Sequence, residues 1–304
     1  MNMRLPPGKK AALAISIDCD GCTVARAREV LGFWNGELGL PVATSMFLFS
    51  RNPSAPPQAS YLDGDRDALR ELYERGWIDT LHSLGDVVAP VPRDEVVRAL
   101  ETLRADGVRL EVWTNHGGPG NSQKLGVATG RGDVPGDPAY VADLLREYGI
   151  RYVWPSELTH LVGQDRPATA GEWYGSYPAA SWPARLLARI LPPRPLGIEP
   201  YPGNAQVEPR SLRDGSQVLA FRRYGFWRFD TVPALPRLLA PPVLDRLVES
   251  GGSMILYLHI GPSVGVTPEL TRAGLDALRE VARRPELWVA RTADLLRSET
   301  NQPG

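Results

Sequence analysis

Short apolar runs alternate with amphipathic segments along most of this chain. Apolar and β-branched runs bounded by turn residues are typical of buried strands, whereas apolar residues at helical spacing indicate the helices that cover them. The strands predicted in this way are residues 11–17, 42–50, 79–82, 108–114, 150–154, 253–259 and 287–290. The helices predicted between them are residues 24–38, 65–75, 93–106, 139–148 and 268–284. This alternation favours an α/β protein with a parallel sheet or barrel and crossover helices.

Residues 155–217 interrupt this rhythm, because the stretch is dense in proline and glycine and predicts only one clear helix, 184–191. Long irregular insertions in compact domains are usually functional loops or lids. The insertion also carries several aromatic residues that could stack on sugar faces, although local packing explains them equally well. These residues are Trp173, Tyr174, Tyr177, Trp182 and Tyr201. We therefore expect a single domain, residues 1–304, with 155–217 as an insertion or lid.

Length and composition agree with a soluble enzyme. The formal net charge is −1, which gives no electrostatic reason to expect binding to nucleic acid or an anionic membrane. The first apolar run is broken by Asp18 too soon for a signal peptide, and no apolar segment approaches the ~20 residues of a membrane helix. With two cysteines that we expect to be reduced, the sequence predicts a soluble, cytoplasmic protein.

Two carboxylates stand where the first predicted strand stops. Asp18 and Asp20 belong to the sequence Asp18-Cys19-Asp20-Gly21, which leads into the first predicted helix. Two residues apart on an extended chain, their side chains point the same way. One of them could hold a metal ion while the other handles a proton.

Three of the four histidines also end apolar runs. His82, His116 and His259 close or follow predicted strands, whereas His160 lies in the insertion and is interpreted as a loop residue. A buried histidine that only satisfies a backbone carbonyl is the plainer explanation for each one alone. Three histidines at equivalent strand ends make that explanation poorer, and the pattern predicts a catalytic or metal site there.

The order of these residues resembles the polysaccharide deacetylase family, the NodB-homology carbohydrate esterases. Asp18-Cys19-Asp20 is similar to the family's Asp-x-Asp motif, and residues 82–86, His-Ser-Leu-Gly-Asp, are similar to its His-Ser/Thr-x-x-His motif. Residues 255–259, Ile-Leu-Tyr-Leu-His, match its apolar strand ending in Leu-x-His or Leu-His. The resemblance covers about residues 11–296 and implies a distorted (β/α)7-type barrel, seven-stranded rather than eight-stranded.

The resemblance implies roles for five of these residues. Asp20, His82 and Asp86 would hold a divalent metal, Asp18 would be the catalytic base, and His259 would protonate the leaving group. Zn²⁺ is the expected metal, while the carboxylate donors also suit Mn²⁺ or Fe²⁺. The implied reaction is metal-dependent hydrolysis of an N-acetyl or other N-acyl amide on an amino sugar, either a small molecule or a glycan precursor.

The sequence also departs from the family. Asp86 stands where the family generally has its second metal histidine, a change that keeps a ligand. The fourth predicted strand ends in Asn115-His116-Gly117, and no arginine is present there to orient the base as the family's third motif does. Asn115 and His116 therefore become candidates for a further metal ligand or a substrate contact.

Further candidates line the expected mouth of the site. Gly117 lies in a glycine turn whose backbone N–H groups could meet a sugar, and Trp227 and Asp230 are expected to contact substrate. Asp230 could also orient His259 as a family acid does. Core packing explains the aromatic residues around Trp227 equally well.

Three other functions compete with the deacetylase interpretation. A glycoside hydrolase would use Asp18 with Asp20 or Glu157 as acid and base, but it would not need three strand-end histidines. A non-catalytic sugar-binding relative would explain the altered motifs, but not the presence of both Asp18 and His259. The Cys-x-x-Cys sequence at residues 19–22 suggests a thiol–disulfide oxidoreductase, which leaves the histidines unexplained.

Overall fold

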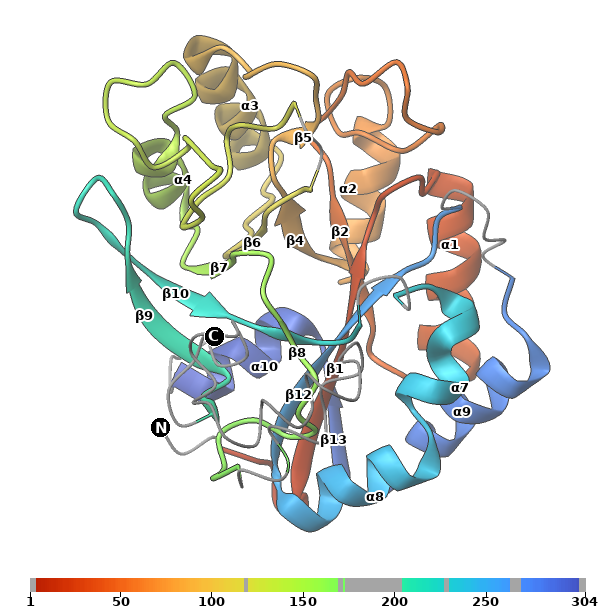
Figure 1. The fold of residues 1–304 in the computed structure, drawn as a ribbon. Helices are drawn as coiled ribbons and strands as arrows, with labels where there is room; N and C mark the ends of the chain where they lie inside the picture. The colour runs from red at the N-terminus through yellow and green to blue at the C-terminus, as the bar shows by residue number, and fades with distance from the viewer. Residues whose placement is uncertain are drawn as a thin grey trace, which may run out of the picture.

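A computed structural model describes residues 4–117, 120–168, 172, 204–226, 230–262 and 269–300. Two long parallel strands run side by side through the middle of the molecule, β1 (Ala11–Asp18) and β12 (Gly252–His259) (Figure 1). Every residue of β1 is buried, because the strand has neighbours on both sides and a cover of side chains on both faces. The predicted first and sixth strands are therefore confirmed, and β1 carries Asp18 into the interior.

The other strands of the main sheet are shorter. They are β2 (Ala43–Met46), β4 (Ile78–His82), β6 (Val112–Thr114), β7 (Tyr152–Trp154), β8 (Leu158–Thr159), β9 (Val207–Ser211), β10 (Gln217–Phe221), β11 (Arg223–Tyr224) and β13 (Leu287–Ala290). In the described residues their order is β8-β11-β12-β1-β2-β4-β6-β7-β10-β9, with β13 paired to β1. The β9–β10 pair is antiparallel, whereas the pairs from β12 to β7 are parallel.

One stretch of chain closes this sheet into a barrel. β10 and β11 are separated only by Arg222, yet β10 pairs with β7 while β11 pairs with β12. Because β7 and β12 lie at opposite ends of the central strands, the β10–β11 stretch joins the two ends. With that stretch counted as one, the barrel strands are β12, β1, β2, β4, β6, β7 and β10–β11. The predicted distorted (β/α) barrel is confirmed.

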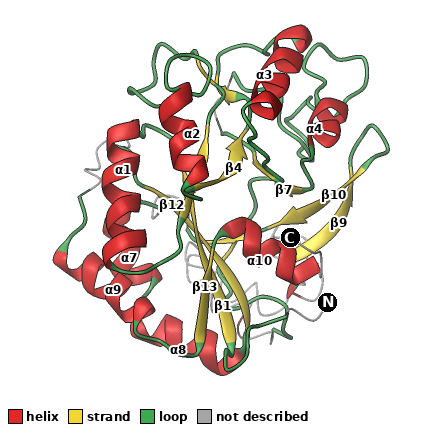
Figure 2. Cartoon of the chain, turned by 180° about the vertical axis from the view of Figure 1, so that it is seen from behind, coloured by secondary structure: helices red, strands yellow, loops and turns green. Residues whose placement is uncertain are grey.

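Helices cover the outside of the strands, and α1, α2, α3 and α4 follow one another around them when the molecule is seen from behind (Figure 2). The helices are α1 (Val24–Gly32), α2 (Arg66–Glu74), α3 (Arg93–Ala105), α4 (Ala142–Tyr148), α7 (Leu235–Leu238), α8 (Pro241–Ser250), α9 (Arg272–Ala282) and α10 (Thr292–Thr300). Within the described residues, none is long and apolar enough to cross a bilayer.

Several predicted boundaries were wrong for local reasons. The first predicted helix changes after Gly32 into a π-helical turn, Phe33–Glu37. The helix predicted to start at 268 begins at Arg272, because the Thr271 hydroxyl caps it by accepting the N–H of Gly274. The strand predicted over 42–50 divides into β2 and β3 (Phe49–Ser50). β3 pairs with β5 (Gly85–Asp86) in a separate two-stranded sheet.

Other differences concern the region around the insertion. The strand predicted over 108–114 is only β6, and the helix predicted from 139 begins at Ala142 as α4. The predicted helix 184–191 and the aromatic residues of the insertion lie outside the described residues. The β9–β10 hairpin, β11, α7, α8 and α10 were not predicted, and the hairpin begins inside the segment expected to be irregular.

A polar contact between α2 and the end of α3 gives a test of this packing. The Asp106 carboxylate accepts hydrogen bonds from Arg66 Nη2 at 2.6 Å, and from Arg66 Nε and Tyr61 Oη at 2.7 Å each. The hydrogen bonds from Arg66 hold the pKa of Asp106 down to about 2. An Asp106→Asn variant should lower the free energy of unfolding by about 1–2 kcal/mol at neutral pH, measured by denaturant unfolding.

The effect should depend on pH in one direction. Because the folded-state pKa of Asp106 lies below its unfolded value of about 3.9, its contribution is present above about pH 4 and is lost as the pH falls toward 2. Asp94→Asn is the control, since Asp94 forms its ion pair with Arg98 on the exposed face of α3. Two outcomes would show that the Asp106 contact is not stabilising. Either both substitutions change the free energy of unfolding equally, or the difference between the wild type and Asp106→Asn stays the same at low pH.

Candidate active site

The turn that follows β1 packs directly against the turn that follows β12. A Cβ atom on Gly261 would lie 2.1 Å from the carbonyl oxygen of Asp20, so only glycine fits there. Gly21 has a φ of +60°, and its N–H donates a 3.0 Å hydrogen bond to Gln58 Oε1. Through these backbone contacts the Asp18–Gly21 segment is held beside the end of β12, where His259 lies.

Strand register brings the remaining site residues to the same edge of the barrel. Asp18 is paired with His259 across β1 and β12, and His82 is paired with Thr114 across β4 and β6. His116 follows β6 by two residues, and its backbone N–H donates to Ser83 Oγ at 2.8 Å. The carboxyl ends of parallel strands therefore collect the histidines around the two carboxylates, as the sequence pattern predicted.

Asp20 lies at the centre of this group, between three histidines. Its Oδ1 atom is 2.8 Å from His116 Nε2, and its Oδ2 atom is 3.3 Å from His259 Nε2 and 3.5 Å from His82 Nδ1. Burial raises the pKa of Asp20, but the neighbouring imidazoles of His82, His116 and His259 outweigh it and hold this pKa well below its usual range. Oδ2 is buried and, within the described residues, accepts no hydrogen bond of good geometry.

Asp18 has a different partner. Its Oδ1 atom accepts a 2.8 Å hydrogen bond from Arg223 Nη1, and both side chains are almost completely buried. The Arg223 guanidinium also lies over the Trp154 ring, 4.3 Å from its centroid. The second carboxylate oxygen of Asp18 is 3.7 Å from His82 Nε2. Asp18 is thus paired with a buried cation, while its other oxygen faces the site.

Arg223 is a candidate site residue that the sequence reasoning missed. No arginine follows the fourth predicted strand, and the structure supplies one from β11, on the stretch that closes the barrel. The available signal was a charged pair, Arg222-Arg223, inside an otherwise apolar run. An arginine inside an apolar run is expected to be buried, and a buried arginine needs a carboxylate partner.

His259 is held from behind by Asp230. Its Nδ1 atom is 3.4 Å from Asp230 Oδ2, and its backbone N–H donates to the Asp230 carbonyl at 2.6 Å. Burial lowers the pKa of His259, but hydrogen bonds to Asp20 and Asp230 outweigh it and raise this pKa well above the usual value. His259 is therefore able to carry a proton in the site at neutral pH, with Nε2 as the atom that faces Asp20.

His82 is more deeply buried than His259. Its Nδ1 atom lies 3.3 Å from Ser45 Oγ and 3.7 Å from Cys19 Sγ, and its ring stacks on Phe47 at a centroid distance of 4.8 Å. Burial lowers the pKa of His82, which favours the neutral imidazole. A neutral imidazole is the form that binds a metal ion.

His116 and Asn115 have separate tasks. The His116 ring lies edge-on to the His82 ring, with centroids 5.2 Å apart and an interplanar angle of 89°. Asn115 accepts hydrogen bonds from Trp113 Nε1 and the Leu125 N–H, and it donates one to the Leu125 carbonyl. The Asn115 amide thus anchors the loop that carries His116, whereas His116 itself reaches Asp20.

Asp86 lies behind His116. Its two carboxylate oxygens accept hydrogen bonds from the side-chain amides of Asn52 and Gln58, each at 3.0 Å. Asp86 Oδ1 is also 4.0 Å from His116 Nδ1, an atom that is buried and has no hydrogen-bond partner in the described part of the chain. Gln58 ties this group to the Asp20 turn, because its Oε1 atom accepts the Gly21 N–H.

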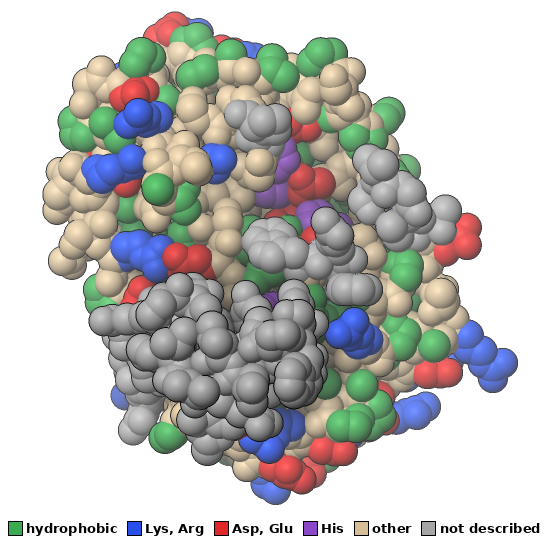
Figure 3. All heavy atoms as spheres, in the orientation of Figure 1, with side chains coloured by type: hydrophobic (Ala, Val, Ile, Leu, Met, Phe, Trp, Pro, Cys, Tyr) green, Lys and Arg blue, Asp and Glu red, His purple; other side chains and the backbone are tan. Residues whose placement is uncertain are grey.

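Two cavities meet at Asp20, His116 and His259. The inner cavity, of about 240 Å³, is also lined by Asp18 and Gly117. The outer cavity, of about 400 Å³, opens past Asp86 and Asp230 instead. Figure 3 shows acidic and histidine side chains gathered in a hollow on this face of the molecule. Trp227, predicted to contact substrate, lies outside the described residues.

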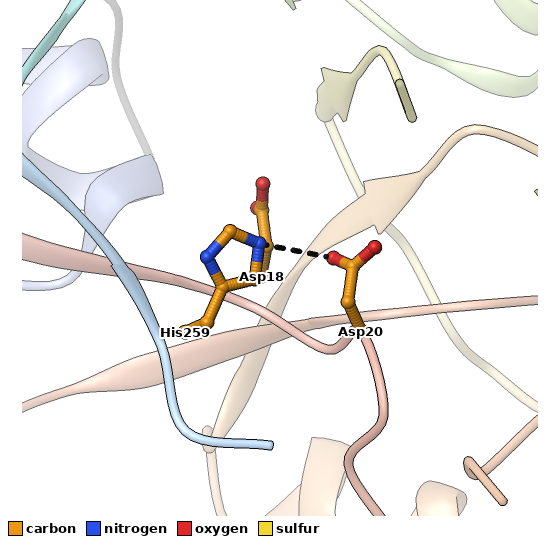
Figure 4. A group of neighbouring side chains, drawn as sticks. All are labelled: Asp18, Asp20 and His259. Carbon is orange, nitrogen blue, oxygen red and sulfur yellow. Dashed lines mark ion pairs between the residues drawn. The ribbon is translucent and has the colours of Figure 1, made fainter. Parts of the chain in front are cut away.

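The donor set fits a divalent metal ion. Asp18, Asp20 and His259 each offer one ligand atom, and these atoms lie within 4.8 Å of one another (Figure 4). His82 and His116 approach Asp20 from other sides. A buried carboxylate oxygen without a hydrogen-bond partner, surrounded by imidazole nitrogens, is the donor chemistry that zinc and similar metals take.

The structure weakens two of the competing interpretations. Cys19 and Cys22 are buried thiols, and burial raises the pKa of Cys22 to about 12 and that of Cys19 well above its usual value. A thiol–disulfide oxidoreductase needs the opposite shift. Glu157, considered as a glycosidase acid, forms a two-point ion pair with Arg210.

Comparison with known proteins places the fold. No family model and no curated protein matches the chain. A crystal structure described as a "putative polysaccharide deacetylase" from Mycobacterium smegmatis matches 98% of this chain and 93% of its own, with 14% identity and a TM-score of 0.50. A 4-alpha-glucanotransferase from Thermococcus litoralis matches 95% of this chain and 40% of its own, with 11% identity and a TM-score of 0.47. The chain therefore has the fold of the structure described as a deacetylase, as the motifs predicted.

Proposed function

We propose that this chain is a metal-dependent hydrolase that removes an N-acetyl or other N-acyl group from an amino sugar or glycan precursor. The observation that carries the proposal is the Asp20 carboxylate, which lies between three histidines. Its Oδ2 atom is buried and, within the described residues, accepts no hydrogen bond of good geometry. The fold shared with a structure described as a deacetylase agrees with this reaction class.

Asp20, His82 and His116 are the proposed metal ligands. The two imidazole rings are perpendicular and both approach the Asp20 carboxylate. His116 takes the role that the sequence assigned to Asp86, because both Asp86 oxygens already accept amide hydrogen bonds. Asp86 instead faces His116 Nδ1, where a carboxylate orients a metal-binding imidazole. When bound, the metal supplies a Lewis acid for the acyl carbonyl and lowers the pKa of a water molecule.

Asp18 and His259 are the proposed base and acid rather than ligands. The Arg223 partner already neutralises Asp18, and the Asp230 carboxylate favours a protonated His259, which disfavours metal binding by that ring. Asp18 accepts the proton of the attacking water as the water oxygen bonds to the acyl carbon. His259 Nε2 then gives a proton to the nitrogen as the C–N bond breaks, which leaves a carboxylic acid and a free amine.

The lining of the two cavities supports one orientation of the substrate. Asp18 lines only the inner cavity, so the acyl carbon that receives the water belongs there. Asp230, which supports the acid His259, lines only the outer cavity, so the amine-bearing sugar belongs there. The shared residues Asp20, His116 and His259 then surround the amide bond itself.

Metal content gives a direct test of the ligand set. Purified protein should bind about one equivalent of zinc or another transition metal in elemental analysis. Asp20→Asn, His82→Gln and His116→Gln should each lose it, because three ligands are needed for tight binding. Asp86→Asn should keep the metal with an affinity about 10–100-fold weaker.

His160→Gln is the control for loss of a histidine, because His160 stacks on Phe226 and lines neither cavity of the site. Loss of metal in Asp86→Asn but not in His116→Gln would contradict the proposed set and favour Asp86 as the third ligand. A wild-type protein that binds no metal even after reconstitution would contradict the hydrolase mechanism and favour a sugar-binding protein.

Product analysis separates the deacetylase from a glycoside hydrolase. On N-acetylglucosamine oligosaccharides the metal-loaded protein should release acetate, and a chelator should abolish release until metal is restored. Asp18→Asn should keep the metal and lose at least about 100-fold in kcat, since it removes the general base. New reducing ends that appear in the presence of the chelator would instead support glycoside hydrolysis.

The buried ion pair between Asp18 and Arg223 gives a stability test. Arg223→Gln should lower the free energy of unfolding by about 3–5 kcal/mol, because it leaves the Asp18 charge buried without its partner. In the Asp18→Asn background, Arg223→Gln should lower the free energy of unfolding by clearly less. The double-mutant cycle should therefore give a coupling energy above about 1 kcal/mol. Additive effects in denaturant unfolding would show that the two side chains do not interact energetically.

A further inference from the structure

We propose that Tyr257 is an additional catalytic residue, whose hydroxyl donates a hydrogen bond to the acyl carbonyl oxygen as negative charge builds on it. The inference rests on the proposed hydrolase function and goes beyond it, because it assigns a role to a side chain that none of the motifs named. It also identifies a donor supplied by the chain itself for the charge that forms during amide hydrolysis.

The position of Tyr257 on β12 directs its side chain into the site. Tyr257 precedes His259 by two residues on an extended strand, so the two side chains leave the same face of the sheet. It lines the inner cavity together with Asp18 and Asp20 and is only 5% exposed. The hydroxyl oxygen lies 3.4 Å from His259 Nε2, the atom proposed to protonate the leaving nitrogen.

Packing holds the Tyr257 ring in place. The ring centroid is 5.1 Å from that of Trp154 and 5.0 Å from that of His259. The guanidinium carbon of Arg223 is 5.4 Å from the same ring. A donor that is fixed before the reaction stabilises developing charge without the cost of reorientation, which is the requirement for an oxyanion site.

The chemistry needs only a hydrogen bond from this group. A tyrosine hydroxyl, with an ordinary pKa near 10, is protonated at neutral pH and can donate. Asp18 takes the proton of the attacking water and His259 supplies the proton of the amine, so Tyr257 transfers none. Tyr257 lines the inner cavity, where the acyl group is proposed to bind, so its hydroxyl is a donor available to the carbonyl oxygen. The hydrogen bond strengthens as the carbonyl oxygen becomes negative.

The test compares Tyr257→Phe with the wild type on N-acetyl and N-trifluoroacetyl derivatives of the same amino sugar. For the N-acetyl substrate we expect kcat to fall about 100-fold with little change in KM, the size of effect seen when one oxyanion donor is removed. For the N-trifluoroacetyl substrate the loss should be about 10-fold or less, since fluorine already withdraws charge from the oxygen. Metal content and circular dichroism should be unchanged.

Tyr152→Phe is the matched control. Tyr152 is also a buried tyrosine on a barrel strand, but its hydroxyl bonds to Thr300 Oγ1 at 2.7 Å, away from the site. Loss of the Tyr152 hydroxyl should leave the ratio of the kcat values for the two substrates the same as in the wild type. A Tyr257→Phe variant that slows both substrates equally, or neither, would overturn the catalytic role. If the metal-loaded wild type turned over neither substrate, the hydrolase function itself would fall, and the role of Tyr257 with it.

Discussion

The buried ion pair between Asp18 and Arg223 is the interaction on which the rest of the site depends. It joins β1, in the middle of the sheet, to the β10–β11 stretch that closes the barrel. A buried charge without a partner costs several kcal/mol, and closure of the barrel is what brings Arg223 to Asp18. Closure also brings the Trp154 ring over the same guanidinium. The contact that completes the fold is therefore the contact that positions Asp18, the proposed base.

Two carboxylates separated by one residue acquire different tasks from different surroundings. Asp18 faces the buried guanidinium of Arg223 at 2.8 Å. Asp20 faces imidazole nitrogens, which are metal donors as well as hydrogen-bond donors. His82 and His259 differ in the same way, because burial lowers the pKa of one and neighbouring carboxylates raise that of the other. When different surroundings separate the pKa values of similar groups, one site can hold both an acid and a base.

The sequence predicted the site residues that come from strand ends, because parallel strands bring their carboxyl ends together whatever the details of the loops. Asp18, Asp20, His82 and His259 belong to this class. Arg223 was missed because β11 has only two residues and its partners are distant in sequence, so no local period marks it. The surroundings of Asp86 depend likewise on the two-residue strand β5 and on the amides of Asn52 and Gln58. Local pattern predicts elements and faces, whereas long-range pairing decides which side chains meet.

The most direct measurement is an anomalous scattering map, collected at the zinc edge, from crystals grown with one equivalent of zinc. The account predicts one strong peak at coordination distance, about 2.0–2.2 Å, from Asp20, His82 and His116. It also predicts that Asp18 stays paired with Arg223 and does not coordinate the metal. A peak coordinated by Asp18 and His259, or no peak beside Asp20, would contradict the account.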